Sequence, residues 1–333
     1  MDELCGVEGQ DRARAGNETI EQHVERLTQH AIDRWRSALA ASGDPRRQAI
    51  GLALTNAVPG GPVITDEELV PGNEPSKDTP ANNNLVLLAV ETGDPTIYSL
   101  ALGLCKNTLT DDMASGPCAG LSWEHWASID PDNGMPWLWI AAKAEQSGEQ
   151  QAVENALAKA STAARIESYG STVNGLALGA LPGDAAPLEK AVAGSDVWYT
   201  LHAGVPLELV SLCAASAIQQ PVRKQQCSAI ATILAKAGPT YMDLAIASHL
   251  ADRLGFPEET RAALKAERQN GRAALNGLFP WQNSNNGSVF RCDVVLAFDR
   301  FIDALRANGG NERAALRAVM QARPQERNSS AGR

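Results

Sequence analysis

Histidines are the side chains of this chain that titrate near neutral pH, so they are the first candidates for acid–base or metal chemistry. Two of the five, His23 and His30, lie two helical turns apart, too far to share one metal ion simply. His125 sits between two tryptophans, and His249 lies one turn before Asp252, as in surface ion pairs. The sequence contains no H-E-x-x-H, G-x-S-x-G or Walker phosphate loop. We therefore predict no catalytic residue, metal site or cofactor; the open alternative is an all-α hydrolase or lyase built from distant groups.

Four of the six cysteines form two close pairs in the sequence. Twelve residues separate Cys105 from Cys118, and thirteen separate Cys213 from Cys227, which is neither a zinc-knuckle spacing nor a C-x-x-C motif. One cysteine of each pair ends a predicted helix and the other opens the next, so their Cα atoms can approach to disulfide distance. We predict these two disulfides, with buried free thiols as the alternative. The candidates for a third pair are Cys5 and Cys292.

Tryptophans supply the candidate binding residues. Four of the seven fall within 17 residues: Trp123, Trp126, Trp137 and Trp139. The first two are one turn apart on one predicted helix, whereas the second two lie on different faces of the next helix. Aromatic residues at helical spacing usually belong to the core, but at least one of these four is expected to be partly exposed. A partly exposed tryptophan is a candidate hot spot for a partner.

Helix signals recur along the chain, whereas alternating strand patterns between Asn-Gly or Asp-Gly turns are missing. Alanine, the best helix former, supplies 54 of the 333 residues. A capping box at Thr19–Gln22 opens an amphipathic helix, and Asp44-Pro45 and Asp94-Pro95 each pair an N-cap with proline at the first helical position. We predict an all-α fold of about 12 helices. Those downstream span 84–92, 95–105, 118–129, 136–147, 150–168, 206–218, 222–236, 240–254, 257–275, 290–307 and 312–322.

Two segments lack helix signals. Residues 58–83 hold five prolines, three glycines and the acidic run Asp66-Glu67-Glu68, which predicts a mobile or surface loop, with a binding loop as the alternative. Residues 323–333 have no apolar anchor and are predicted to be disordered.

An internal repeat is indicated by the spacing of the cysteine pairs, whose first members lie 108 positions apart and whose second members lie 109 apart. Repeated spacing of this kind suggests stacked helical hairpins, with chance similarity among alanine-rich helices as the alternative. A shift of 107 residues matches Ala144 with Ala251, Gly148 with Gly255, and Leu157 with Leu264.

The segment from Asp130 to Trp137, with the sequence DPDNGMPW, resembles the D-P-x-N-x-x-x-W junction between tetratricopeptide repeats. Downstream, the family's small, glycine and bulky positions are matched by Ala141, Gly148, Leu157 and Ala160. The segment departs from the family at Ala144 and Val153 and lacks the closing proline near 164. Cysteine-stapled hairpins are also similar to Sel1-like repeats. The resemblance, centred on residues 130–160, implies an α-solenoid of antiparallel helical hairpins that binds proteins or peptides, and it implies no catalytic residue.

The charge is acidic and uneven. The net charge is −10, with −12 in residues 1–166 and +2 in residues 167–333. Nucleic acid and anionic membrane both require a basic footprint, so neither is expected as a partner. No stretch is apolar enough to insert into a membrane, and residues 1–6 do not resemble a signal peptide. The predicted disulfides favour a periplasmic or secreted protein whose leader has been removed; the alternative is a cytoplasmic protein.

The length exceeds that of a usual single core, so we expect two helical lobes, 1–170 and 171–322. The leading hypothesis is a non-enzymatic helical-repeat scaffold that binds a protein or peptide. A second hypothesis is an inhibitor or immunity protein that plugs a toxin with its acidic N-terminal half. The sequence does not indicate an oligomeric state.

Overall fold

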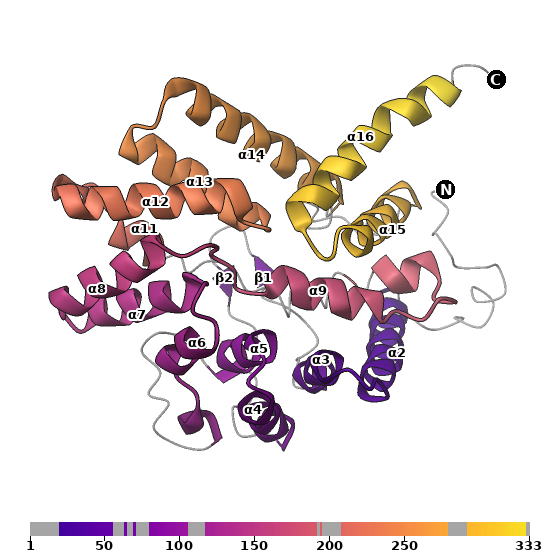
Figure 1. Cartoon of the computed structure of the whole chain (residues 1–333). Helices are drawn as coiled ribbons and strands as arrows, with labels where there is room; N and C mark the ends of the chain where they lie inside the picture. The colour runs from indigo at the N-terminus through magenta and orange to yellow at the C-terminus, as the bar shows by residue number, and fades with distance from the viewer. Residues whose placement is uncertain are drawn as a thin grey trace. The chain divides into compact units, whose positions relative to one another are not determined.

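The computed structural model of the chain describes residues 20–55, 63–64, 69–70, 80–105, 117–191, 194, 208–278 and 292–330 (Figure 1). These residues are helical almost throughout, so the predicted all-α class is confirmed, with more helices than the twelve expected. The longer helices are α2 (Ile20–Ala40), α3 (Pro45–Thr55), α4 (Pro80–Thr92), α5 (Pro95–Cys105), α6 (Trp123–Ile129), α7 (Met135–Gln146), α8 (Gln150–Ser161), α9 (Gly170–Gly179), α12 (Pro221–Ala237), α13 (Tyr241–Leu254), α14 (Glu258–Leu278), α15 (Cys292–Ala307) and α16 (Glu312–Ser330). Shorter pieces are α11 (Glu208–Leu212) and the 3₁₀ helices η1 (Pro117–Gly120) and η2 (Ala217–Gln219).

A small antiparallel ladder lies within the predicted loop 58–83. Strand β1 (Val63–Ile64) pairs with β2 (Leu69–Val70), with Val63 opposite Val70. We predicted no strand here, because two-residue runs are too short to show an alternating pattern. β-branched residues such as valine and isoleucine nevertheless favour extended backbone. The other residues of 58–79 lie outside the described part of the chain.

The chain forms two compact units, and each unit takes segments from distant parts of the sequence. Unit 1 comprises Met1–Ser76, Thr172–His202 and Arg272–Arg333; unit 2 comprises Lys77–Ser171 and Ala203–Gly271. This differs from the sequential lobes 1–170 and 171–322 that we predicted. The reason is that α11 packs on α7 and α12 packs on α8, so residues 208–271 complete the core begun by residues 80–161.

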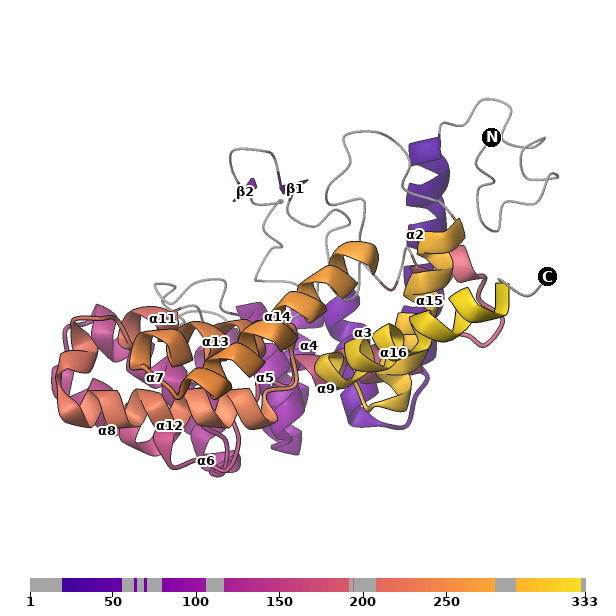
Figure 2. The same cartoon turned by 90° about the horizontal axis from the view of Figure 1, so that it is seen from above.

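In unit 2, the helices pack on one another in chain order. Contacts join α4 to α5, α5 to α6, α6 to α7 and α7 to α8; α8 then packs on α12, and α12 on α13 (Figure 2). Ala141 and Leu138 of α7 and Ala160 and Leu157 of α8 are all fully buried. Small side chains let neighbouring helices approach closely, while leucines fill the grooves between them.

Two turns within unit 2 have the same geometry. Gly148, between α7 and α8, and Gly255, between α13 and α14, both have φ of 72°. In each, the N–H of the following residue donates to a carbonyl five residues back, Glu149 to Ala144 at 2.8 Å and Phe256 to Ala251 at 3.0 Å. This is the left-handed helix ending that glycine favours.

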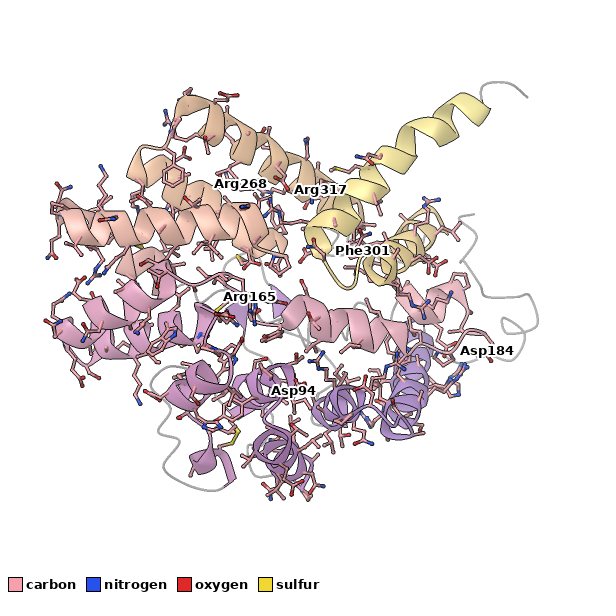
Figure 3. The ribbon with its side chains drawn as sticks, in the orientation of Figure 1. Asp94, Arg165, Asp184, Arg268, Phe301 and Arg317 are labelled. Carbon is pink, nitrogen blue, oxygen red and sulfur yellow. A yellow bond between two sulfur atoms is a disulfide. The ribbon has the colours of Figure 1, made fainter. Side chains whose placement is uncertain are left out.

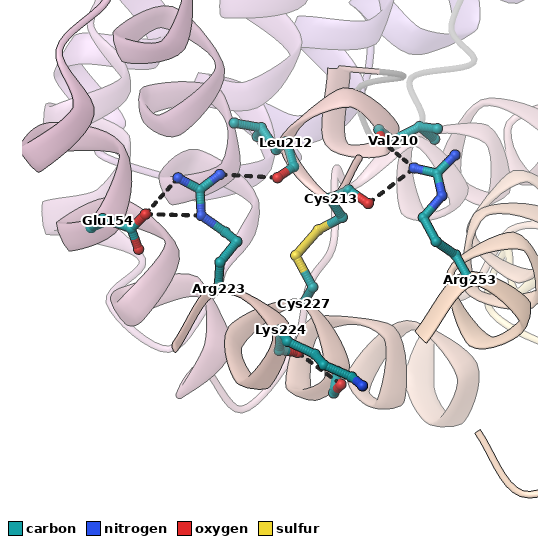
Figure 4. Close-up of a disulfide and its surroundings, with 9 residues drawn as sticks. Glu154, Val210, Leu212, Cys213, Arg223, Lys224, Cys227 and Arg253 are labelled. Atoms are coloured by element: carbon teal, nitrogen blue, oxygen red, sulfur yellow. Dashed lines mark hydrogen bonds and ion pairs between the residues drawn. A yellow bond between two sulfur atoms is a disulfide. The ribbon is translucent and has the colours of Figure 1, made fainter. Parts of the chain in front are cut away.

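Both predicted disulfides are present. Cys105, at the end of α5, is bonded to Cys118 of η1, and Cys213 is bonded to Cys227 of α12 (Figure 4). The Cα–Cα distances are 5.7 and 6.0 Å, respectively, and all four residues are buried. Cys5 and the side chain of Cys292 lie outside the described residues, so the third pair stays a prediction.

The short helix α11 ends beside the second disulfide. Two arginines donate hydrogen bonds to the backbone carbonyls at this helix end (Figure 4). Arg223 Nη1 donates to the Leu212 carbonyl at 3.0 Å, and Arg253 Nη1 donates to the carbonyls of Val210 at 2.8 Å and Cys213 at 3.0 Å. Helix ends leave such carbonyls without helical partners, so these bonds replace the missing ones. Arg223 is buried and also donates through Nε and Nη2 to Glu154 of α8.

In unit 1, α2 packs on α3 and α15 packs on α16. Arg34 of α2 binds Asp184 at 2.6 Å and Glu189 at 3.1 Å, and Lys190 lies 3.3 Å from Asp299 of α15. These ion pairs attach the segment that follows α9 to both ends of the unit's sequence. The largest buried side chains of this unit include Trp35, Leu39, Phe298 and Phe301.

Several predicted boundaries differ from the observed ones. We predicted one helix over 150–168, but α8 ends at Ser161 because residues 164–167 bond to the α6–α7 junction. We did not predict α9, and α4 begins at Pro80, inside the predicted loop. Helix α16 continues to Ser330, so the backbone is helical over part of the segment 323–333 that we predicted to be disordered; Arg323, Gln325, Glu326 and Arg327 there favour helix. Among the described helices, none is long and apolar enough to cross a membrane.

Candidate binding site

The four predicted tryptophans lie together on α6 and α7 of unit 2. Trp123 and Trp126 are buried, with 5% and 2% of their surface exposed. Trp137 and Trp139 are only partly buried. The prediction that at least one of the four is partly exposed is therefore confirmed, and α7 carries the two that a partner can reach.

Trp139 is held by an aromatic stack. Its indole lies parallel to that of Trp123, with ring centroids 4.9 Å apart and planes 4° apart. The Trp126 ring lies 5.9 Å from that of Trp123 and is tilted by 40° against it. Stacking on a buried ring restricts the rotamers of Trp139. The part of Trp139 that reaches solvent is therefore already ordered before any partner binds.

The first turn of α6 fixes the position of Trp123. Ser122 is the N-cap, and its hydroxyl oxygen accepts a hydrogen bond from the His125 N–H at 3.1 Å. The Ser122 N–H donates to the hydroxyl oxygen of Tyr98 on α5 at 3.0 Å. The ring of Tyr98, which is fully buried, lies 5.1 Å from the exposed ring of His125. Burial raises the pKa of Tyr98, the Ser122 bond lowers it, and Glu124 raises it further, so the phenol stays neutral at physiological pH.

At the C-terminal end of α6, the buried carboxylate of Asp130 accepts hydrogen bonds from three side chains. Asp130 follows the last residue of α6 and accepts hydrogen bonds from Arg165 Nη2, from the Tyr169 hydroxyl at 2.8 Å and from Asn133 Nδ2 at 2.8 Å. Arg165 Nη2 also donates to the Tyr169 oxygen at 2.8 Å. Figure 3 shows Arg165 in the loop between α8 and α9. Hydrogen bonds from three donors offset the free-energy cost of burying a carboxylate.

Asn133 ties that loop to the α6–α7 junction. Its Oδ1 accepts from the N–H groups of Met135 and Glu167, both at 3.0 Å, and its Nδ2 donates to the Glu167 carbonyl at 2.8 Å. The Gly134 N–H donates to the Arg165 carbonyl at 2.8 Å, which completes a short parallel bridge. The start of α7, and with it Trp137, is therefore fixed by bonds from both sides of the junction.

Tyr169 is unusual in its backbone and in its ionisation. With a φ of 63° it is the one non-glycine residue with positive φ in the described part of the chain. Burial raises its pKa to about 12; the Arg165 hydrogen bond opposes this rise, and Asp130 adds to it. Burial alone would lower the pKa of Arg165, but Tyr169, Asp130 and Glu167 raise it. At neutral pH the cluster therefore has a neutral phenol and a paired guanidinium, both bonded to Asp130.

Two of the described histidines each lie beside a charged side chain. His30 Nδ1 lies 4.0 Å from Glu189, and His249 Nε2 lies 2.8 Å from Arg253 Nη2. The side chain of His23 lies outside the described residues. No group of three or more His, Cys, Asp or Glu side chains placed to hold a metal ion occurs in the described ranges.

Comparison of the chain with protein-family models, with curated proteins and with solved structures found no match.

Sequence reasoning located the tryptophans but not the residues that position them. In the sequence, Asp130 and Asn133 stand out only as part of the tetratricopeptide-like motif, and no pattern singles out Arg165 or Tyr169. Their partners lie 34 to 39 positions away, and nothing in the local sequence marks such pairs. The one local signal was the mismatch between a predicted long helix 150–168 and the Ser-Tyr-Gly turn that follows it.

Proposed function

We propose that this chain is a non-enzymatic helical-repeat scaffold that binds a protein or peptide partner around α7, through Trp139 on one face of that helix and Trp137 on another. The observation that carries the proposal is the stack of Trp139 on buried Trp123, which leaves an ordered aromatic side chain partly exposed on α7. Aromatic side chains held in this way are typical anchors of protein interfaces, because little entropy is lost when they bind.

A repeat architecture is supported by the two matching helix pairs in unit 2. The turns at Gly148 and Gly255 lie 107 positions apart and share their φ and their hydrogen-bond pattern. The buried leucines Leu157 and Leu264 occupy the same offset on the helices that follow. We propose that α7–α8 and α13–α14 are copies of one tetratricopeptide-like hairpin, in an α-solenoid of such hairpins. From α4 to α8 each helix packs on the next one in the chain, which is the arrangement that this architecture requires.

An oxidising compartment, periplasmic or extracellular, is the proposed location. Two buried disulfides support this location, and each links cysteines only 13 or 14 positions apart in the sequence. Structural disulfides persist in such compartments and are rare in a reducing cytosol.

Selection from a random peptide library displayed on phage tests the binding proposal. The purified protein is expected to enrich related peptides, and Trp137→Ala and Trp139→Ala are expected to reduce their affinity about tenfold or more. Val222→Ala, at an exposed apolar side chain of α12, is the matched control and should bind as the wild type does. Failure to enrich any peptide, or equal binding by all four proteins, would contradict the proposal.

A further inference from the structure

Helix α14 carries four basic side chains along one side. They recur at steps of four, three and four residues: Arg261, Lys265, Arg268 and Arg272. At about 100° per residue, this spacing keeps all four within about 60° of the helix circumference and spreads them over about 17 Å. Lys265 and Arg272 are exposed and the other two are half-buried; Arg268 is labelled in Figure 3. We call these four residues the basic stripe.

Little negative charge on α14 itself offsets the basic stripe. Arg261 pairs with Glu258, one turn earlier, whereas the other three members form no ion pair with a described residue. The remaining acidic residues of the helix are Glu259 and Glu267, and neither is three or four positions from a member of the stripe. Three of the four positive charges are therefore uncompensated within the helix.

The helices beside α14 in unit 2 supply few acidic residues. Leu264 of α14 clusters with Leu244 and Ala251 of α13, and α13 packs on α12. Helix α12 contains no Asp or Glu, and α13 contains Asp243, which is buried in a capping box, and the exposed Asp252. Together, α12, α13 and α14 hold eight basic and five acidic residues, in a chain whose net charge is −10.

The basic stripe lowers the intrinsic stability of α14. Lys265 follows Arg261 by four residues, Arg268 follows Lys265 by three, and Arg272 follows Arg268 by four. Like charges at these spacings are neighbours on the helix surface and destabilise it, whereas opposite charges would stabilise it. A local conflict of this kind is expected where residues serve binding rather than folding.

We propose that the basic stripe binds an acidic segment of a protein partner, whose carboxylates have a matching helical spacing. Arginine presents a planar fork of donors that suits a carboxylate, and lysine adds a flexible ammonium group. Four exposed residues beside the stripe are uncharged and mostly small, so a polypeptide can lie close to the helix; they are Ala262, Ala266, Gln269 and Ala273.

Nucleic acid and anionic membrane fit these observations less well. Proteins that bind single-stranded nucleic acid combine positive charge with aromatic side chains, and α14 contains no aromatic residue. A helix that lies on a membrane presents large apolar side chains to the lipid, but Leu264 and Leu278 of α14 are buried within the protein. Both are also extended polyanions that the net charge of −10 repels, whereas a short acidic segment is screened from charges more than about 8 Å away.

The contact is expected to be weak and sensitive to salt. Exposed ion pairs each contribute little to affinity, so four of them predict a dissociation constant of about 0.1–1 mM at low salt. Their main effect is on the rate and orientation of association. The basic stripe includes no residue of α7, so this inference does not depend on binding through Trp137 or Trp139.

Fluorescence anisotropy with two labelled, alanine-rich peptides tests the proposal. One peptide has four glutamates at steps of four, three and four residues, and the other has the same composition with the glutamates spread around the helix. The first should bind at about 20 mM salt, lose most of its affinity at about 300 mM, and bind about threefold or more tighter than the second. Circular dichroism verifies that every protein variant is folded.

Lys265→Gln/Arg268→Gln should weaken binding of the first peptide about fivefold or more. Lys224→Gln/Lys236→Gln, which removes two charges from exposed lysines of α12, is the matched control and should bind as the wild type does. Trp139→Ala should also bind this peptide normally, which separates the stripe from the proposed function.

Equal affinity of the wild type and Lys265→Gln/Arg268→Gln, or an equal loss in the α12 control, would overturn the proposal. Equal binding of the two peptides would contradict the matched spacing. Single-stranded oligothymidylate or phosphatidylserine vesicles are tested in the same way. Tighter binding of either one than of the acidic peptide, lost in Lys265→Gln/Arg268→Gln, would overturn the assignment to a protein segment.

Discussion

The hydroxyl of Tyr169 donates a hydrogen bond to Asp130 at 2.8 Å, across 39 positions of sequence. This bond, together with those of Arg165 and Asn133, joins the end of α6 to the loop that precedes α9. Because α7 begins two residues after Asn133, the same cluster determines how Trp137 and Trp139 are positioned. The predicted effects of breaking it are therefore effects on stability and on the candidate site together.

Replacing the buried carboxylate should cost stability. Asp130→Asn removes the charge that pairs with Arg165 and one of the acceptors that Tyr169 and Asn133 share. We expect the free energy of unfolding to fall by about 2–3 kcal/mol, less than for a fully enclosed pair because Arg165 is partly solvated. Urea denaturation measures the change. Asp132→Asn, at an exposed carboxylate two residues away, is the control and should change stability by less than about 0.5 kcal/mol. Equal stability of the two variants would contradict the role of Asp130.

The raised pKa of Tyr169 predicts a loss of stability at alkaline pH. Its pKa is about 12 in the folded chain against an ordinary value of 10.0, so the folded state holds this proton more tightly than the unfolded state. The associated stability is fully present below pH 10.0 and is lost as the pH rises through about 12. Denaturation from pH 8 upward should show a smaller alkaline loss for Tyr169→Phe than for the wild type. Identical pH profiles for the two proteins would rule out this contribution.

The disulfide beside α11 should be a major source of stability for unit 2. Cys213 and Cys227 are separated by 14 positions, and closing a loop of this length contributes about 3 kcal/mol. Cys213→Ala/Cys227→Ala should therefore lower the free energy of unfolding by about that amount. The double variant at Cys105 and Cys118, separated by 13 positions, is the natural comparison and should show a similar loss. An unchanged urea midpoint for either variant would contradict the prediction for that disulfide.

Close backbone packing in unit 1 predicts a different result for two glycines of the same helix. A Cβ atom added to Gly175 of α9 would lie 2.8 Å from the Cα and N atoms of Gly310, between α15 and α16, whereas one added to Gly179 would meet nothing within 4 Å. Gly175→Ala should destabilise the chain by about 1–3 kcal/mol, because backbone must move to admit the methyl group. Thermal unfolding is the measurement. Gly179→Ala should unfold within a degree or two of the wild type, and an equally small effect at Gly175 would show that α9 does not pack on that turn.

Local sequence signals were reliable where a helix end is determined by its own residues. Asp94-Pro95 predicted the start of α5, and Asp94 Oδ1 does accept from the N–H groups of Thr96 and Ile97. Asp94 is labelled in Figure 3. The cysteine spacings likewise predicted both disulfides, because each pair spans one junction between neighbouring helices.

Local sequence patterns gave wrong predictions where contacts between residues far apart in the sequence determine the structure. Residues 162–168 continue the alanine-rich pattern of α8, yet they leave the helix because Asn133 and Asp132 bond to residues 164–167. The division of the chain into units also depends on the packing of α12 on α8, a pairing that no local pattern encodes. For the candidate site, the sequence predicted which residues are aromatic but not which two reach solvent, because Trp139 owes its orientation to Trp123.

Photo-crosslinking from α7 shows directly whether a partner protein binds at this helix. A benzophenone amino acid replaces Trp137, or as a control Val222 of α12, in the full chain produced in its own cells, and adducts formed on irradiation are identified by mass spectrometry. We expect one dominant protein adduct from position 137 that is absent from position 222 and disappears when Trp139→Ala is added. No adduct from position 137, or the same adducts from both positions, would contradict it.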